Sequence, residues 1–529
     1  MPRGISQGGL IVRRTRFLSS ILATLALLAA APVAAAADPA VVRTADGPVR
    51  GTVTDTNRTF QGIPFAAPPT GENRWRAPQH VTPWESTKDA TRPGSVCPQR
   101  PITDPNGPQD GAEDCLFLNV STPRTSGTKP VMVWIHGGGY TTGAGSDYPV
   151  TQLAERGDVV VVTLNYRLGA LGFLSLPGLD GGGDFGLADQ QAALKWVQHN
   201  ARAFGGDPHN VTIFGESAGG LSVCAQLTSP RARGLFHKAI IQSGPCEITW
   251  GDGQQMPGQP AGGYSISRTD ADKTGSGVAA KLGCADIGCL RATPVAKLLD
   301  FPLGQPAFGT PLLPEDPAQA VGHRASVPTM IGMNRDENRL GALLFPEPLT
   351  PETYVAAVRG AYGAAADRVL AKYPVTAYPS PTIAWTAIST DVIWARSTHR
   401  ITGQLASRVP TFGYEFRDRT VPSMIPGTSG LGAYHTAELP YLFPGAQQFH
   451  GAQPITLNAD QQALGLQLQR YWATFAHTGR PNGPGLPAWR PNLPSDNTVQ
   501  GLDIAPAGIG RIDQVTDHNL DFWSEILDH

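Results

Sequence analysis

Short, continuously apolar runs alternate along the chain with segments whose apolar residues recur at helical spacing. The apolar runs cover residues 131–136, 159–164, 211–214, 238–243 and 329–333. The clearest helical segment, residues 187–203, carries apolar side chains near one face at Leu187, Ala193, Leu194, Val197 and Ala201. Short apolar strands separated by helices are typical of a mostly parallel sheet covered on both faces. The pattern therefore predicts an α/β fold.

No linker of distinct composition divides the chain after its N-terminal segment, so we expect a single domain over residues 38–529. That length is long for one domain, and we interpret roughly residues 250–330 and 340–430 as large insertions. Loops in open α/β sheets gather at the carboxyl ends of the strands. The insertions are therefore expected to cap that edge of the sheet.

Residues 1–37 have the composition of a secretion signal. Arg13, Arg14 and Arg16 precede an apolar run over residues 17–30, and four alanines at 34–37 suit a signal peptidase. We expect cleavage near residues 37 and 38 and a secreted protein, either extracellular or in the cell envelope.

The export route is left open by the sequence. The pair Arg13–Arg14 is typical of a twin-arginine signal, but Arg16 stands where such a signal has Phe, so the general secretory route fits equally. A retained N-terminal anchor is the alternative to cleavage. No later segment is apolar enough to span a bilayer.

Composition and charge exclude some classes of partner. The chain has 529 residues, of which 41% are hydrophobic and 16% charged, as in ordinary globular proteins. Removing residues 1–37 removes four arginines and no acid, which leaves 37 basic and 43 acidic residues and a net charge of −6. Neither nucleic acid nor an acidic membrane surface is an expected partner.

An even number of cysteines in an exported chain suggests disulfides. The six are Cys97, Cys115, Cys224, Cys246, Cys284 and Cys289. The first two flank a stretch rich in Pro, Gly and Asp that requires a covalent link to stay ordered. The last two are placed to close a small surface loop. The middle two either pair or remain buried thiols, and we favour pairing.

The segment 211–220, VTIFGESAGG, carries the strongest chemical signal in the chain. A strand runs into a G-x-S-x-G turn with Ser217 at its apex, and an Ala-rich helix follows, as in the nucleophile elbow of an α/β-hydrolase. Gly215 and Gly219 leave room for backbones that a Cβ would crowd. The N–H of Ala218, at the start of the helix, is placed to meet a carbonyl oxygen that becomes negative.

Several further motifs, in order along the chain, resemble the type-B carboxylesterase/lipase family, which includes the cholinesterases. They are FQGIPFA with Pro68–Pro69 (60–69), EDCLFLNV (113–120), HGGG (136–139), NYR (165–167), FGGDP (204–208), QSG (242–244) and the segment 472–482. The resemblance covers the chain from about residue 40 to its end and implies an α/β-hydrolase fold. One departure is Asp184, where the family commonly has Asn.

The resemblance implies a Ser-His-Glu triad in the chain order serine, acid, histidine. His435 lies in GAYHTAELPY (432–441), which is similar to the family's G-x-x-H-x-x-[DE]-L-P-Y. Glu337 closes the segment NRDE (334–337), similar to the family's G-x-N-x-D-E, with Asp336 as the neighbouring acid. His435 would take the proton of Ser217, and Glu337 would orient the imidazole. The competing interpretation of both acids is a solvated charged loop.

Two further roles follow from the same resemblance. The backbone N–H groups of Gly138, Gly139 and Ala218 would form the oxyanion hole. A merely flexible glycine turn is the alternative for the first two. Glu216, directly before the nucleophile, would hold a water molecule or help to orient His435, unless its role is structural.

The implied reaction is hydrolysis of small-molecule carboxylic esters through an acyl-Ser217 intermediate, with a broad range of short and medium acyl groups. Residues 98–114 contain no Trp, Tyr or Phe, which argues against a cholinesterase, and their polarity argues against a lipase lid. A lipase, a specialised ester or amide hydrolase and, more remotely, a non-catalytic binding module remain alternatives. No cofactor and no metal site is expected, and the oligomeric state is not predicted.

Overall fold

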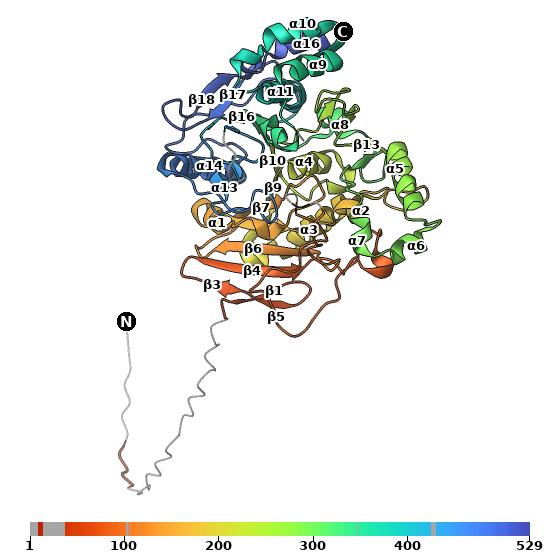
Figure 1. Cartoon of the computed structure of the whole chain (residues 1–529). Coiled ribbons are helices and arrows are strands. Elements are labelled where there is room, and N and C mark those ends of the chain that lie inside the picture. Colours follow the sequence, from red (N-terminus) through yellow and green to blue (C-terminus); the bar gives the residue numbers. More distant parts are fainter. Residues whose placement is uncertain are drawn as a thin grey trace, which may run out of the picture. The chain divides into compact units, whose positions relative to one another are not determined.

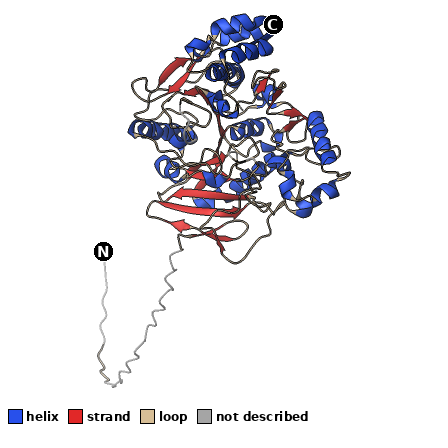
Figure 2. Ribbon diagram, in the orientation of Figure 1, coloured by secondary structure: helices blue, strands red, loops and turns tan. Residues whose placement is uncertain are grey.

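The computed structural model describes residues 9–13, 38–101, 104, 106–345, 347–424 and 430–528. Contacts divide the chain into two units, Met1–Asp38 and Pro39–His529. Apart from residues 9–13, the expected signal sequence lies outside the described residues. The sheets and helices described below belong to the second unit (Figures 1 and 2).

Eleven strands form the central sheet of the second unit. Their order is β18 (Gly510–Asp513), β17 (Thr498–Leu502), β16 (Thr411–Phe416), β15 (Thr329–Asn334), β10 (Lys238–Gln242), β9 (Gly206–Glu216), β7 (Lys129–Ile135), β8 (Val160–Leu164), β6 (Phe117–Pro123), β4 (Asn57–Pro64) and β3 (Thr52–Val53). The strands from β17 to β8 are parallel, and the pairings at both edges are antiparallel. The expected mostly parallel sheet is confirmed.

Helices cover both faces of this sheet because successive side chains of its strands point to opposite faces. In β7, Val131, Val133 and Ile135 pack into one core, whereas Met132 and Trp134 pack into the other. The first core includes residues of α3 (Phe185–Asn200), α4 (Ala218–Thr228), α8 (Pro317–Arg324) and α12 (Arg396–Ala406). The second includes residues of α1 (Thr151–Gly157) and α14 (Ala459–Thr478). Figure 1 shows α4 beside β9 and β10.

The remaining elements surround this core. The helices are α2 (Gly169–Phe173), α5 (Arg268–Lys281), α6 (Ile287–Ala292), α7 (Val295–Leu298), α9 (Pro351–Tyr362), α10 (Ala366–Lys372), α11 (Pro381–Ser389), α13 (Leu439–Leu442), α15 (Gln514–Asp517) and α16 (Leu520–Leu527). Short helical turns are η1 (Gly71–Asn73), η2 (Gly145–Asp147), η3 (Ala201–Phe204), η4 (Pro230–Ala232), η5 (Glu337–Leu344), η6 (Gly363–Ala365), η7 (Val375–Ala377) and the π-helix η8 (Thr390–Ala395). Three small sheets pair β1 (Val41–Arg43), β2 (Pro48–Arg50) and β5 (Lys88–Asp89); β11 (Thr249–Trp250) and β12 (Gly262–Gly263); and β13 (Ile266–Ser267) and β14 (Ala307–Phe308).

The second predicted insertion is shorter than expected. Residues 340–430 were expected to lie outside the sheet, but β16 (Thr411–Phe416) is one of its parallel strands. The strand contains Glu415, whose side chain is fully buried, at 0% exposure. Two basic side chains neutralise this carboxylate. His518, which is distant in the sequence, places Nε2 at 2.9 Å from Oε2, and Arg417, two residues after Glu415, places Nη1 at 2.7 Å from Oε1. A buried charge with such a partner cannot be identified from the local apolar pattern.

Three disulfides join the six cysteines as Cys97–Cys115, Cys224–Cys246 and Cys284–Cys289. The favoured pairing of the middle two is confirmed, and it ties α4 to the segment after β10. In the part of the chain that the structure describes, no helix has both the length and the apolar character needed to cross a membrane.

Asp184, the departure from the family pattern, has a structural role. Its Oδ1 accepts the N–H of Ala307 at 2.8 Å, and its Oδ2 accepts the hydroxyl of Thr310 at 2.7 Å. Burial raises the pKa of this carboxyl to about 7, although both hydrogen bonds act in the opposite direction. The residue therefore anchors the segment around β14 to the start of α3.

Candidate active site

Ser217 stands at a sharp turn between β9 and α4. Its backbone has φ +57° and ψ −124°, a strained conformation for a residue with a side chain. A Cβ on Gly219 would lie 2.0 Å from the carbonyl oxygen of Ile135, and one on Gly215 would lie 2.6 Å from that same oxygen. Both glycines are therefore required for the close approach of β7, as the sequence predicts.

Glu337 and His435 come together from segments that follow different elements. Glu337 begins η5, directly after β15, and His435 precedes α13. His435 Nδ1 lies 2.6 Å from Glu337 Oε2, and the backbone N–H of His435 donates to the Glu337 carbonyl at 3.2 Å. The other carboxylate oxygen of Glu337 accepts the N–H of Asn334 at 2.7 Å. The carboxylate is thus held in place while it contacts the imidazole.

The neighbouring acid, Asp336, has different partners. Its carboxylate accepts from Nε and Nη2 of Arg419 at 2.8 and 2.7 Å, and it pairs with Arg339 at 3.1 Å. The N–H of Ala433 donates to it as well. Of these two acids, Glu337 is the one that the structure places on the imidazole of His435.

The second imidazole nitrogen faces Glu216. His435 Nε2 lies 3.3 Å from Glu216 Oε1, and both side chains are buried. Ser217 and His435 line one cavity, but no hydrogen bond between their side chains occurs among the described residues. In unliganded hydrolases this bond is often long and tightens only when substrate binds.

Several buried carboxyl groups surround His435 and change its protonation. Burial alone would lower the pKa of the imidazole, but the carboxylates of Glu216 and Glu337 outweigh it and raise the pKa to about 9. Burial also raises the pKa of Glu216 well above its usual value, and the nearby Glu438 and Glu337 add to that increase. For each of these two groups, burial disfavours the charged form and the opposite charge of its neighbour favours it.

The three residues that the sequence predicts for the oxyanion hole line the same cavity. They are Gly138 and Gly139, in the turn after β7, and Ala218, the first residue of α4. Gly138 and Gly139 have φ +100° and +60°, which side chains rarely permit. None of the three N–H groups donates to an acceptor within the described part of the chain.

The cavity at Ser217 has a volume of about 200 Å³ and mostly apolar walls. Leu221 follows Ser217 by one helical turn, and Trp394, Tyr264 and Phe449 contribute aromatic surface. The Trp394 ring lies 4.8 Å from the ring of His435, centroid to centroid. The lining includes no lysine or arginine in the described residues. Such a cavity fits a small, uncharged organic group.

Comparison with known proteins decides the family. The model of the carboxylesterase family matches residues 38–523. The chain belongs to the carboxylesterase family. A para-nitrobenzyl esterase of Bacillus subtilis (strain 168) is 36% identical over 459 residues, which cover 84% of this chain and 90% of that protein. A cocaine esterase of Homo sapiens is 32% identical, over 89% of this chain and 87% of that protein.

Solved structures agree with the sequence comparison. A PNB esterase superimposes with a TM-score of 0.74 at 33% identity, covering 91% of this chain and 99% of that one. The fold of this carboxylesterase is therefore the α/β-hydrolase fold, and its activity is carboxylic ester hydrolysis.

The aromatic wall of this carboxylesterase could not be predicted from local sequence. Trp394 lies in the π-helix η8, Tyr264 between two short strands, and Phe449 after α13. None of them stands in a motif, and each reaches the cavity only through the path of a long connection. The π-helix offered the one general hint, since such bulges are frequent at functional sites, but it is visible only in the structure.

Proposed function

We propose that this carboxylesterase acts through an acyl-Ser217 intermediate, with His435 as general base and Glu337 as the acid that orients it. The main support for this proposal is the distance of 2.6 Å between Glu337 Oε2 and His435 Nδ1. Both residues line the same cavity as Ser217. This contact leaves Nε2 as the nitrogen that exchanges protons. A neutral imidazole is required at the start of the cycle.

The first half of the cycle forms the acyl-enzyme. Ser217 Oγ attacks the ester carbonyl carbon while its proton moves to His435 Nε2. The carbonyl oxygen becomes negative and accepts hydrogen bonds from Gly138, Gly139 and Ala218, each worth about 3 kcal/mol of barrier. The bond to the leaving alkoxide then breaks, and His435 Nε2 returns the proton to it, which releases the alcohol.

The second half releases the acid. Water gives its proton to His435 Nε2 and attacks the acyl carbon, and the same N–H groups stabilise the second oxyanion. The bond between the acyl carbon and Ser217 Oγ then breaks, and His435 Nε2 returns the proton to Oγ. Glu216, whose carboxyl lies 3.3 Å from Nε2, is proposed to position the imidazole and to share its proton. No other group is needed to balance the reaction.

We propose a broad substrate range of uncharged esters with short or medium acyl groups. The small, mostly apolar cavity without a lysine or arginine among its described lining residues supports this range. Relatives of this chain carry names that refer to different esters, a para-nitrobenzyl esterase, a cocaine esterase and a pyrethroid hydrolase. The variety of these names is the second support.

We also propose that the protein is exported and that residues 38–529 form its mature domain. The arginines and apolar run of residues 1–37 and the three disulfides support this proposal. N-terminal sequencing of protein recovered outside the cytoplasm is expected to begin near Asp38. Recovery of the full chain with an intact N-terminus would contradict cleavage.

The test of the proposed mechanism is the variant Ser217→Ala assayed with p-nitrophenyl butyrate. We expect kcat to fall by roughly a factor of 10⁶, as when the nucleophile of a triad is removed, with the circular dichroism spectrum unchanged. Ser276→Ala, a change on the outside of α5, is the matched control and should keep full activity. Substantial hydrolysis by folded Ser217→Ala protein would refute the assignment.

A further inference from the structure

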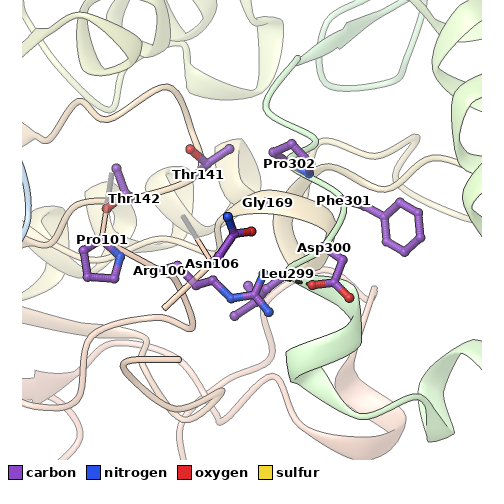
Figure 3. A pocket seen from close by; sticks show the side chains of 10 residues that line it. All are labelled: Arg100, Pro101, Asn106, Thr141, Thr142, Gly169, Leu299, Asp300, Phe301 and Pro302. Carbon is purple, nitrogen blue, oxygen red and sulfur yellow. Dashed lines mark hydrogen bonds and ion pairs between the residues drawn. The ribbon is translucent and has the colours of Figure 1, made fainter. Parts of the chain in front are cut away.

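A second and larger cavity, of about 500 Å³, lies beside the turn that carries Gly138 and Gly139 (Figure 3). Thr141 and Thr142 of that turn form one wall, and the segment 299–302, after α7, forms the facing wall. Arg100 and Asn106, which lie between Cys97 and Cys115, extend from a third direction in Figure 3. Gly169 of α2 completes the lining, so four separate parts of the chain contribute to the cavity.

The two cavities share a residue. Thr141 lines both of them, and it is bound to the oxyanion turn because its N–H and its hydroxyl donate to the Gly138 carbonyl at 3.0 and 3.3 Å. The facing segment is pressed against the same turn, since a Cβ on Gly304 would lie 2.2 Å from the carbonyl oxygen of Gly139. Thr141 therefore stands at the boundary between the two cavities.

The Ser217 cavity is too small to hold a long ester. Its volume of about 200 Å³ is below the range of roughly 300–1,000 Å³ that is usual for small-molecule sites. An ester larger than a short acyl group and a small alcohol must extend beyond it. The second cavity provides about 500 Å³ directly beside it.

The walls of the second cavity define what it accepts. Arg100 Nη1 is paired with Asp300 Oδ1 at 2.9 Å, and Nη2 donates to the Ala296 carbonyl at 3.2 Å, so the guanidinium keeps further N–H donors. The amide of Asn106 lies between this pair and Thr141 in Figure 3. Leu299 and Pro302 add apolar surface, whereas the ring of Phe301 points away from the other lining side chains in Figure 3. The Arg100–Asp300 pair has no net charge, so it offers hydrogen bonds without selecting an ion of either sign.

We propose that the second cavity is a specificity subsite for the distal part of an extended ester, and that it selects an uncharged group that accepts hydrogen bonds, such as an ether or a carbonyl. The proposal rests on the proposed function, because the ester must be attacked at Ser217. Arg100 and Asn106 donate to the distal oxygen, and Leu299 and Pro302 pack against the chain that carries it.

The test compares esters of equal length in the wild type and in one double variant. One pair extends the alcohol, 2-(2-methoxyethoxy)ethyl butyrate against heptyl butyrate, and the other extends the acid, ethyl 3,6-dioxaheptanoate against ethyl heptanoate. Ethyl acetate is the short reference. Arg100→Met/Asp300→Leu removes the polar pair while keeping the cavity closed.

In the double variant, we expect kcat/KM to fall about tenfold or more for the ether ester in one of the two pairs, the pair whose extended side reaches the second cavity. This is the loss expected for a hydrogen bond to a charged group. The matched alkyl ester and ethyl acetate should change less than twofold. Equal changes for ether and alkyl esters in both pairs would overturn the proposal. An equal loss for ethyl acetate would also overturn it, because the change would then act on the fold or on Ser217.

A second variant tests the same cavity without touching the ion pair. Leu299→Trp is expected to fill it and to lower kcat/KM for both members of the extended pair about tenfold, with ethyl acetate unchanged. Unchanged turnover of every extended ester would contradict the proposal. A terminal carboxylate or ammonium in place of the ether should reduce turnover by the wild type, and a preference for either ion would refute the selection for uncharged groups.

Failure of this proposal is distinguishable from failure of the proposed function. Loss of the subsite leaves ethyl acetate hydrolysis and its dependence on Ser217 intact. If wild-type protein does not hydrolyse ethyl acetate, or if Ser217→Ala does, the proposed function itself is wrong.

Discussion

Glu337 holds His435 at two points, although 98 residues separate them in the chain. The carboxylate Oε2 lies 2.6 Å from Nδ1 of the imidazole, and the backbone carbonyl of Glu337 accepts the N–H of His435 at 3.2 Å. The side-chain contact engages Nδ1 and leaves Nε2 on the side of Glu216, and the backbone contact fixes the position of the whole residue. In the proposed mechanism, Glu337 therefore orients His435 through its main chain as well as its carboxylate.

Replacing Glu337 by Gln tests this relationship. The amide cannot stabilise an imidazolium and can favour the wrong tautomer, so we expect kcat for p-nitrophenyl butyrate to fall by roughly 10³–10⁴. Asp336→Asn is the matched control, because Asp336 pairs with Arg419 and Arg339 instead. A loss of kcat that is equal in the two variants would contradict the assignment of Glu337.

The protonation of His435 predicts the pH dependence of kcat/KM. The pKa of about 9 means that the imidazole binds a proton below that pH and cannot accept one from Ser217. Activity should therefore rise with pH along an alkaline limb. Glu216→Gln removes a carboxylate that raises this pKa, so the limb should move to lower pH. If the pH at which activity rises stays the same or increases in Glu216→Gln, the proposed effect of Glu216 on the pKa of His435 is refuted.

The turn that carries Gly138 and Gly139 is expected to tolerate no added methyl group without a large loss of activity. A Cβ at Gly138 would lie 2.3 Å from the Thr142 carbonyl oxygen, in a backbone conformation with φ +100°. Gly138→Ala should misplace the N–H donors and lower kcat about 10²–10³-fold. Gly127→Ala is the control, since Gly127 also has positive φ, +89°, but no atom within 4 Å of the added Cβ. Comparable loss of kcat in both would show that backbone strain alone is responsible.

The disulfides predict a graded effect on stability. Removing Cys224–Cys246, which spans 22 residues, should lower the free energy of unfolding by about 3 kcal/mol in the chain-entropy model. Removing Cys284–Cys289, which spans 5, should cost about 2 kcal/mol. Urea unfolding of the two double Cys→Ala variants measures the difference. A larger loss from Cys284–Cys289 would contradict this order.

Local patterns were sufficient to predict the parts of the fold whose determinants are local. The apolar strands at 131–136 and 159–164 appear as β7 and β8, and the predicted helix 187–203 appears as α3 followed by the turn η3. The elbow around Ser217 was also predictable, because its glycines are required by the approach of β7 at short range.

Other features depend on contacts between distant residues and were not predictable in this way. β16 carries the buried Glu415, which is neutralised by His518, 103 residues away. Trp394 reaches His435 only because η8 is held against the turn after β15, where Asn338 binds Ser389 and Thr390. The role of Asp184 is likewise set by Thr310, 126 residues away.

The proposed mechanism is tested most directly by identifying the residue that becomes acylated. Diethyl p-nitrophenyl phosphate reacts with an activated serine and leaves a stable phosphoryl group that tandem mass spectrometry can locate. The proposed mechanism predicts one adduct, on Ser217, formed in proportion to the loss of esterase activity and lost in Ser217→Ala. Complete inactivation with the phosphoryl group on any other residue would contradict it.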